Sequence, residues 1–239
     1  MDGKAGDWPA EGLSRDKTNT IEHGLFLDGS RFIILLRTGS PVMQAKILKA
    51  GMTVYLDPEG KKKSSTALLF PLQKPDEEGD VGQGMNMNAL RVLGMARSTD
   101  YTLRKFKEGN GTYKIGETNP AGVLVAMAFD EQGDLVYEAS IPFQALFGKP
   151  TPEAGDAGKT IDAGYAINAL PEPHALPTAE TGPNAPPPAG LSANLGPRGN
   201  IPGGTLPNST PRAGTGRETT ESAQEAFRNT KIWTSVTLK

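Results

Sequence analysis

Few side chains in this sequence have the types and spacing that catalysis or metal binding requires. The chain has no cysteine and only two histidines, His23 and His174. Thiol nucleophiles, disulfides, zinc ribbons and iron–sulfur clusters are therefore excluded together. His23 alternates with apolar residues along a predicted strand, which is typical of a partly buried histidine rather than a metal ligand. No motif joins it to His174, and we expect the protein to be noncatalytic.

Among the carboxylates, Glu138 stands out because it lies in the middle of a predicted strand. The alternation that sends Tyr137 and Ala139 to one face sends Glu138 to the other. A carboxylate in such a place pairs with an arginine or with backbone amides more often than it acts as an acid or base. We favour this structural role, with acid–base chemistry as the alternative.

Two charged clusters could bind ions, but a simpler interpretation is favoured for each. Four carboxylates that could hold calcium form an acidic run, Asp76, Glu77, Glu78 and Asp80. This run lacks the ligand pattern and the glycine of a calcium-binding loop, so a solvated acidic loop is favoured. Residues 61–63 are three lysines at a predicted hairpin tip, where lysines prevent aggregation more often than they bind phosphate.

The charge balance and the apolar stretches of the sequence argue against two kinds of partner, nucleic acid and the membrane interior. Lys and Arg number 25, and Asp and Glu number 27, so the net charge is −2. This balance provides no positive field for nucleic acid, and we expect no nucleic-acid partner. No apolar stretch reaches the ~18 residues that a membrane helix needs, which predicts a protein that does not span a membrane.

The elements that must position these residues are mostly strands in hairpins. Residues 21–27 and 31–37 flank Asp28-Gly29, a dipeptide that favours a tight hairpin turn. The other predicted strands are 52–57, 64–70, 122–130, 135–141, 161–167 and 231–238, and the predicted helical pieces are 40–51 and 222–227. Strands at such short spacing predict an all-β fold, an antiparallel immunoglobulin-like or jelly-roll-like β-sandwich.

A proline- and glycine-rich segment interrupts this pattern at residues 171–221. It contains no aromatic residue, so it cannot bury enough surface to offset the entropy of ordering its backbone. We interpret it as an irregular insertion, with recognition by a proline-binding partner as the alternative. The strand at 231–238 is too short to be stable alone. We therefore predict one domain, 1–239, whose core comprises 1–170 and 222–239.

Several short motifs occur in a characteristic order along the chain. They are Asp7-Trp8-Pro9 and the stretches at 27–33 (LDGSRFI), 51–57 (GMTVYLD), 137–143 (YEASIPF) and 164–167 (GYAI), followed by Ile232-Trp233. This order resembles the β-sandwich of family 9 carbohydrate-binding modules and the related DOMON domains. The resemblance implies an exported protein, in the periplasm or at the cell surface. The sequence begins without a basic and apolar leader, so export would require a signal peptide that was removed.

The resemblance also implies a site where two aromatic rings sandwich a sugar. The two tryptophans, Trp8 and Trp233, lie where such domains bury an aromatic residue, so we expect both to pack in the core. The candidate glycan-binding residues are instead the arginines and aromatic residues of a segment that the strand pattern does not explain, Arg97, Tyr101, Arg104, Phe106 and Tyr113. Their alternative role is to anchor that segment to the sandwich.

These inferences predict a noncatalytic, exported glycan-binding or accessory module. The alternative is a structural or protein-interaction domain of the cell envelope that has no sugar site. A third hypothesis is haem-linked electron transfer, because haem-binding relatives of this sandwich use methionine among their axial ligands. The methionines that keep this hypothesis open, and that we favour as core residues, are Met43, Met52, Met85, Met87, Met95 and Met127. We expect no cofactor.

Overall fold

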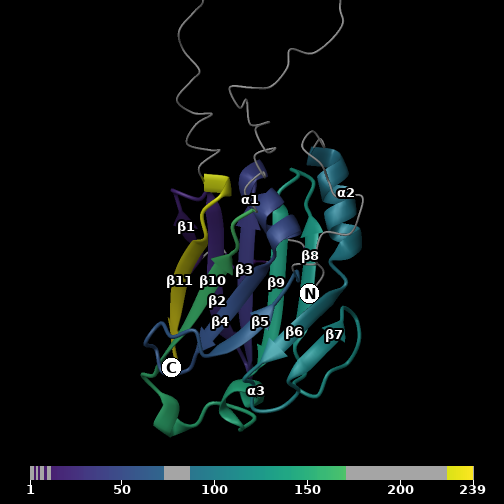
Figure 1. Cartoon of the computed structure of the whole chain (residues 1–239). Coiled ribbons are helices and arrows are strands. Elements are labelled where there is room, and N and C mark those ends of the chain that lie inside the picture. The colour runs from purple at the N-terminus through teal and green to yellow at the C-terminus, as the bar shows by residue number, and fades with distance from the viewer. Residues whose placement is uncertain are drawn as a thin grey trace, which may run out of the picture.

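The protein is an antiparallel β-sandwich with a few short helices (Figure 1). The computed structural model describes residues 3, 5, 8–9, 12–72, 87–170 and 225–238. The five-stranded sheet contains, in spatial order, β1 (Ser14–Asp16), β2 (Ile21–Asp28), β3 (Arg31–Thr38), β9 (Leu135–Pro142) and β8 (Leu124–Phe129). The six-stranded sheet contains β11 (Thr230–Thr237), β10 (Thr160–Ile167), β4 (Met52–Asp57), β5 (Thr66–Leu69), β6 (Asp100–Arg104) and β7 (Gly111–Lys114). This architecture confirms the predicted fold class.

The β2–β3 hairpin forms the middle of the five-stranded sheet. Gly29 has a positive φ of 57° in its tight turn, a conformation that glycine adopts without steric cost. On β3, the side chains of Phe32, Ile34 and Leu36 are fully buried in the core between the sheets. Leu35, on the opposite face, is only 1% exposed, as expected for a strand that is covered on both sides.

The C-terminal strand joins the six-stranded sheet, although it is far from its neighbour in sequence. β11 pairs with β10 along its whole length, from Thr230 opposite Ile167 to Thr237 opposite Thr160. The side chain of Lys46, which is fully buried, helps to hold the start of β11. Its Nζ donates to the carbonyl oxygens of Glu225 (3.2 Å) and Arg228 (2.7 Å) and to Thr230 Oγ1 (2.7 Å). Burial lowers the pKa of Lys46, and the charge of Glu225 opposes this shift.

Short helices cover the ends of the sandwich. Ser40 caps α1 (Pro41–Ala45), which continues as the π-helical turn η2 (Lys46–Ala50) and fulfils the prediction of one helical piece at 40–51. The pattern did not predict α2 (Met87–Arg97), α3 (Phe143–Phe147) or the 3₁₀ turn η3 (Ala154–Asp156). Glu225 and Ala226 are helical and belong to the predicted piece at 222–227.

Several predictions fall on residues outside the described part of the chain. These are the insertion at 171–221, the acidic run at 76–80, His174 and Met85. The remaining methionines of the haem hypothesis lie in the core or against it. Met43, Met52 and Met127 are buried, and Met87 and Met95 pack on the core from α2. Their positions are those of gap-filling side chains.

Candidate functional site

The segment at 97–113 places two of its predicted ligand-binding rings in the core. Tyr101 is 2% exposed and Phe106 is 5% exposed. Along β6, Tyr101 and Leu103 both point between the sheets because alternate strand residues share a face. This burial corrects the expectation that these two rings form a stackable surface, and it agrees with the anchoring alternative.

The other three predicted residues are accessible but do not form one cluster. Tyr113 on β7 is half-buried, and its ring centroid lies 5.8 Å from that of Tyr101. Arg97 is exposed at the end of α2, and Arg104 is exposed on β6. The structure thus brings Tyr101 and Tyr113 together as a packing contact. Whether a glycan binds in this segment stays a prediction.

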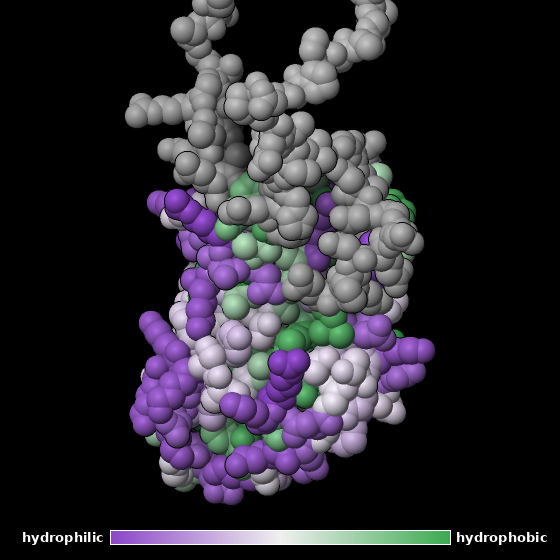
Figure 2. All heavy atoms as spheres, viewed as in Figure 1, coloured by the Kyte–Doolittle hydropathy of each residue, from purple (hydrophilic) through white to green (hydrophobic). Residues whose placement is uncertain are grey.

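A different set of aromatic side chains lies on the outer face of the six-stranded sheet. The pairing register aligns Trp233 on β11 with Gly164 on β10, Tyr55 on β4, Ala67 on β5 and Arg104 on β6. We call these five residues the aromatic row. Their neighbours along each strand, such as Val54 and Leu56 on β4, point into the core. Figure 2 looks onto this face, where pale side chains of intermediate hydropathy lie beside hydrophobic ones, a strongly hydrophilic side chain crosses the middle, and further hydrophilic side chains gather at the edges.

Trp233 lies flat on the sheet instead of entering the core. A Cβ atom added to Gly164 would lie 2.8 Å from each of three atoms of the six-membered indole ring, so this ring sits directly over the glycine. Trp233 is half-buried and is not part of the core cluster. This finding corrects the expectation of core packing. The absence of a side chain at Gly164 is what lets the indole lie against the backbone.

A lysine side chain lies over the aromatic row. Lys231 Nζ is 5.0 Å from the ring centroid of Trp233 and 5.2 Å from that of Tyr55, within the range of a cation–π interaction. The same ammonium group donates to Ser64 Oγ at 2.8 Å. The row therefore combines two half-exposed rings with a hydrogen-bond donor held between them.

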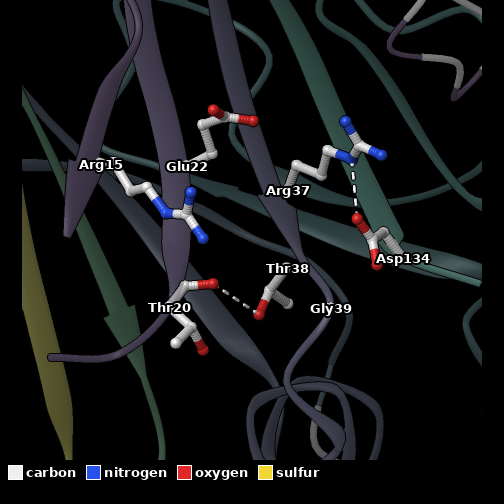
Figure 3. Close-up of a pocket in the computed structure, with 7 residues that line it drawn as sticks. All are labelled: Arg15, Thr20, Glu22, Arg37, Thr38, Gly39 and Asp134. Carbon is white, nitrogen blue, oxygen red and sulfur yellow. Dashed lines mark hydrogen bonds and ion pairs between the residues drawn. The ribbon is translucent and has the colours of Figure 1, made fainter. Parts of the chain in front are cut away.

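The outer face of the five-stranded sheet carries a shallow polar pocket of about 270 Å³ (Figure 3). Its charged lining residues are Arg15, Glu22, Arg37 and Asp134, from β1, β2, β3 and the β8–β9 turn. Arg37 Nη2 pairs with Asp130 Oδ2 at 2.8 Å. Arg37 Nε lies 3.0 Å from Asp134 Oδ2 without forming a well-aligned hydrogen bond, so this contact is an ion pair only. Without an aromatic or apolar wall, the pocket offers little surface for stacking.

Glu138 holds the N-terminal segment against the outer face of the five-stranded sheet. Its carboxylate accepts hydrogen bonds from the backbone N–H of Gly3 (2.9 Å) and from Trp8 Nε1 (2.8 Å). Gly3 lies so close to β8 that an added Cβ would come within 2.7 Å of the Ala128 side chain. Glu138 thus has the structural role favoured from its sequence. Trp8 is half-buried at this contact and lies outside the core cluster, contrary to expectation.

A polar group from each sheet lies buried between them. Tyr165 on β10 donates its hydroxyl to the carbonyl oxygens of Gly24 (2.7 Å) and Leu35 (3.0 Å) in the opposite sheet. The ring of His23 lies 5.5 Å from that of Tyr165, and its Nδ1 has no hydrogen-bond partner among the described residues. Burial lowers the pKa of His23, and the charge of Asp16 acts in the opposite direction. Burial keeps the imidazole neutral, which suits a core position.

The described residues contain no cluster of three or more His, Asp or Glu side chains that could hold a metal ion. No helix in this part of the chain is long and apolar enough to cross a membrane. Among the described residues, the aromatic row is an arrangement whose chemistry suits contact with a ligand. Its two rings can stack against the apolar face of a ring-shaped molecule, and Arg104 of the row and the adjacent Lys231 can donate hydrogen bonds.

No protein-family model, curated protein or solved structure matches this chain.

Proposed function

We propose that this chain is a noncatalytic glycan-binding module and that the aromatic row is its binding surface. The observation that carries this proposal is the Trp233 indole, which lies flat on Gly164 beside Tyr55 on an outer sheet face. A sugar ring has an apolar face of C–H groups and an edge of hydroxyl groups. An amphipathic aromatic ring presented flat on a rigid sheet can contact the C–H face, and neighbouring hydrogen-bond donors can contact the hydroxyl groups.

The spacing of the row also favours an extended ligand. Trp233 and Tyr55 lie on strands separated by one intervening strand, which places their Cα atoms about 10 Å apart. Arg104 lies two strands further along the same register. A flat chain of sugars could contact the two rings in succession and reach the guanidinium group. This arrangement retains Arg104 from the candidate residues of the sequence and replaces the buried rings of Tyr101 and Phe106.

A second candidate function is protein interaction without a sugar site. It is favoured by two apolar side chains of α2, Val92 and Leu93, which are 69% and 39% exposed. Exposed apolar side chains on a helix are a feature of many contact surfaces. Either function would suit the exported location that the resemblance to carbohydrate-binding modules implies.

Affinity electrophoresis through gels that contain soluble polysaccharides tests the proposal. The wild type should be retarded by at least one glycan of a broad panel, and Trp233→Ala should lose this retardation. Trp233 is half-buried, so the substitution should cost only about 1–2 kcal/mol of stability and leave a folded protein. Circular dichroism would verify this.

Phe227→Ala is the matched control, because Phe227 is exposed and lies outside the aromatic row. It should bind as the wild type does. An Arg97→Ala, Tyr113→Ala double variant tests the segment predicted from the sequence. Loss of binding in this variant, with full binding by Trp233→Ala, would move the site to residues 97–113. A folded wild type that binds no glycan in the panel would favour protein interaction.

A further inference from the structure

The loop that connects β4 to β5 folds back beside the aromatic row and carries three lysines. Asp57, which is only 1% exposed, accepts hydrogen bonds from the backbone N–H groups of Glu59 (2.9 Å), Lys61 (2.9 Å) and Lys63 (2.8 Å). Burial acts to raise the pKa of Asp57, but these backbone donors outweigh it, and the pKa is lowered. The carboxylate therefore stays charged and fixes the shape of the loop.

A second buried carboxylate holds the same loop against the neighbouring strand. Asp162 on β10 is 1% exposed, accepts from the backbone N–H of Lys62 (3.0 Å), and also accepts from the Ser235 hydroxyl of β11. Asp162 lies two residues before Gly164 on the same face of the sheet. The loop is thus tied down next to the indole of Trp233, and Ser64 at its end contacts Lys231.

The lysine side chains around the row are exposed, whereas the carboxylates that hold the loop are not. Glu59 is the exposed acid of this loop, and it pairs with Lys61 (3.0 Å) and Lys63 (3.5 Å). Among the described residues, Lys62 and Lys231 have no carboxylate within ion-pair distance. The Lys231 ammonium beside the rings, and the exposed Lys62 side chain of the neighbouring loop, can therefore pair with an anionic ligand.

We infer, on the basis of the proposed function, that the glycan recognised by the aromatic row is acidic. The Lys231 ammonium lies between the two rings, where a stacked sugar would bring its substituents. An ammonium group is a point charge with three donors, so it binds a carboxylate or a sulfate ester with little geometric demand. A charge-assisted hydrogen bond of this kind is stronger than one to a neutral hydroxyl.

The attraction must be local, because the whole chain has a net charge of −2. Long-range steering of a polyanion is therefore weak, and selectivity depends on contact with the row and its loop. Exposed charges are screened within about 8–10 Å at moderate salt. Binding of an acidic glycan should accordingly weaken as salt is added, whereas stacking on the rings should not.

Polygalacturonate and its fully methyl-esterified form provide a matched pair of probes, since they share a backbone and differ in charge. Dextran sulfate and dextran provide the sulfate arm of the test. At low ionic strength, the wild type should bind an acidic member at least about tenfold more tightly than its neutral partner. Lys231→Gln should remove most of this preference, and Lys107→Gln, at an exposed lysine on the β6–β7 loop, should keep it.

Trp233→Ala distinguishes specific binding on the aromatic row from simple charge attraction to the lysines of the β4–β5 loop. This variant should lose binding to the acidic probe, although Lys231 and the three loop lysines remain. Undiminished binding by Trp233→Ala would overturn the inference, because the rings would then take no part. Equal binding of charged and neutral probes, lost in Trp233→Ala, would disprove the acidic preference and leave the glycan site standing. Binding to no probe, charged or neutral, would count against the proposed function as well.

Discussion

Glu138 is the residue on which the position of the N-terminal segment depends. Its buried carboxylate accepts from the Gly3 backbone and from the Trp8 indole. Glu138→Gln should lower the free energy of unfolding by about 1–3 kcal/mol, because an amide keeps only one acceptor oxygen and removes the charge. Urea denaturation would measure the change. Glu131→Gln, at an exposed turn position, should change stability by less than about 0.5 kcal/mol. Equal stabilities of the two variants would refute this role.

His23 makes the stability of the sandwich depend on pH. Folding lowers the pKa of His23 below its ordinary value of 6.5, so the unfolded chain binds a proton more readily than the folded one. The free energy of unfolding should therefore be highest above about pH 6.5 and fall as the pH drops below it. Urea midpoints between pH 5 and 8 would show this slope.

Substitution identifies the group that titrates. His23→Leu removes the imidazole and keeps an apolar side chain in the core, so the slope between pH 5 and 6.5 should flatten. His174→Ala removes the other histidine and should leave the slope unchanged. A slope that persists in His23→Leu would show that another group is responsible.

At the scale of elements, the β10–β11 pair depends on a glycine. Gly164→Ala would place a Cβ 2.8 Å from the indole of Trp233, so the ring must lift from the sheet. We expect a loss of about 1–3 kcal/mol and a red shift of the Trp233 fluorescence, measured in a Trp8→Phe background. Gly155→Ala is the control because nothing lies within 4 Å of its Cβ position. An unshifted emission spectrum in Gly164→Ala would argue against the flat indole.

The hairpins could be predicted because their turn chemistry is local. Asp28-Gly29 closes β2–β3, and β8 and β9 are joined by a short turn in which Asp130 Oδ1 accepts from the N–H groups of Gln132 and Asp134. The β6–β7 hairpin escaped prediction because its strands are short, five and four residues. Its loop is closed by Asn110, which exchanges two hydrogen bonds with the backbone of Phe106. That contact has no simple sequence signature.

The aromatic row could not be predicted because it depends on pairing between distant strands. Tyr55, Gly164 and Trp233 become neighbours only through the register of β4, β10 and β11. Alternation alone indicates that the Tyr55 side chain points to the other face of the sheet from Val54 and Leu56, and that the Trp233 side chain points to the other face from Ile232. It does not indicate that Tyr55 and Trp233 lie on either side of Gly164 on one outer face of the sheet. The expectation that Trp233 is buried was wrong because it rested on the resemblance to domains that bury an aromatic residue at this place, whereas its alternation with the buried Ile232 puts it on the outer face.

At the scale of the whole molecule, the described residues that precede and follow the predicted insertion lie close together. The N–H of Leu170 donates to the carbonyl of Ala226 (2.9 Å), and the N–H of Ala169 donates to Asn229 Oδ1 (2.8 Å). Replacing residues 175–215 with about eight Gly and Ser residues should therefore preserve the fold, because the free energy of loop closure changes slowly with length. The thermal midpoint should stay within a few degrees of the wild type. Loss of cooperative unfolding would show that the segment is needed for the core.

The central claim is that a glycan binds on the aromatic row, and the indole N–H signals of the two tryptophans test it most directly. In a ¹⁵N-correlated NMR spectrum they give two signals, which Trp233→Phe would assign. Titration with polygalacturonate, or with any glycan that retards the protein, should shift the Trp233 signal in a saturable way. The Trp8 signal should stay in place, because its N–H is held by Glu138 on the other sheet. Saturable glycan binding that leaves the Trp233 signal unmoved would contradict the account.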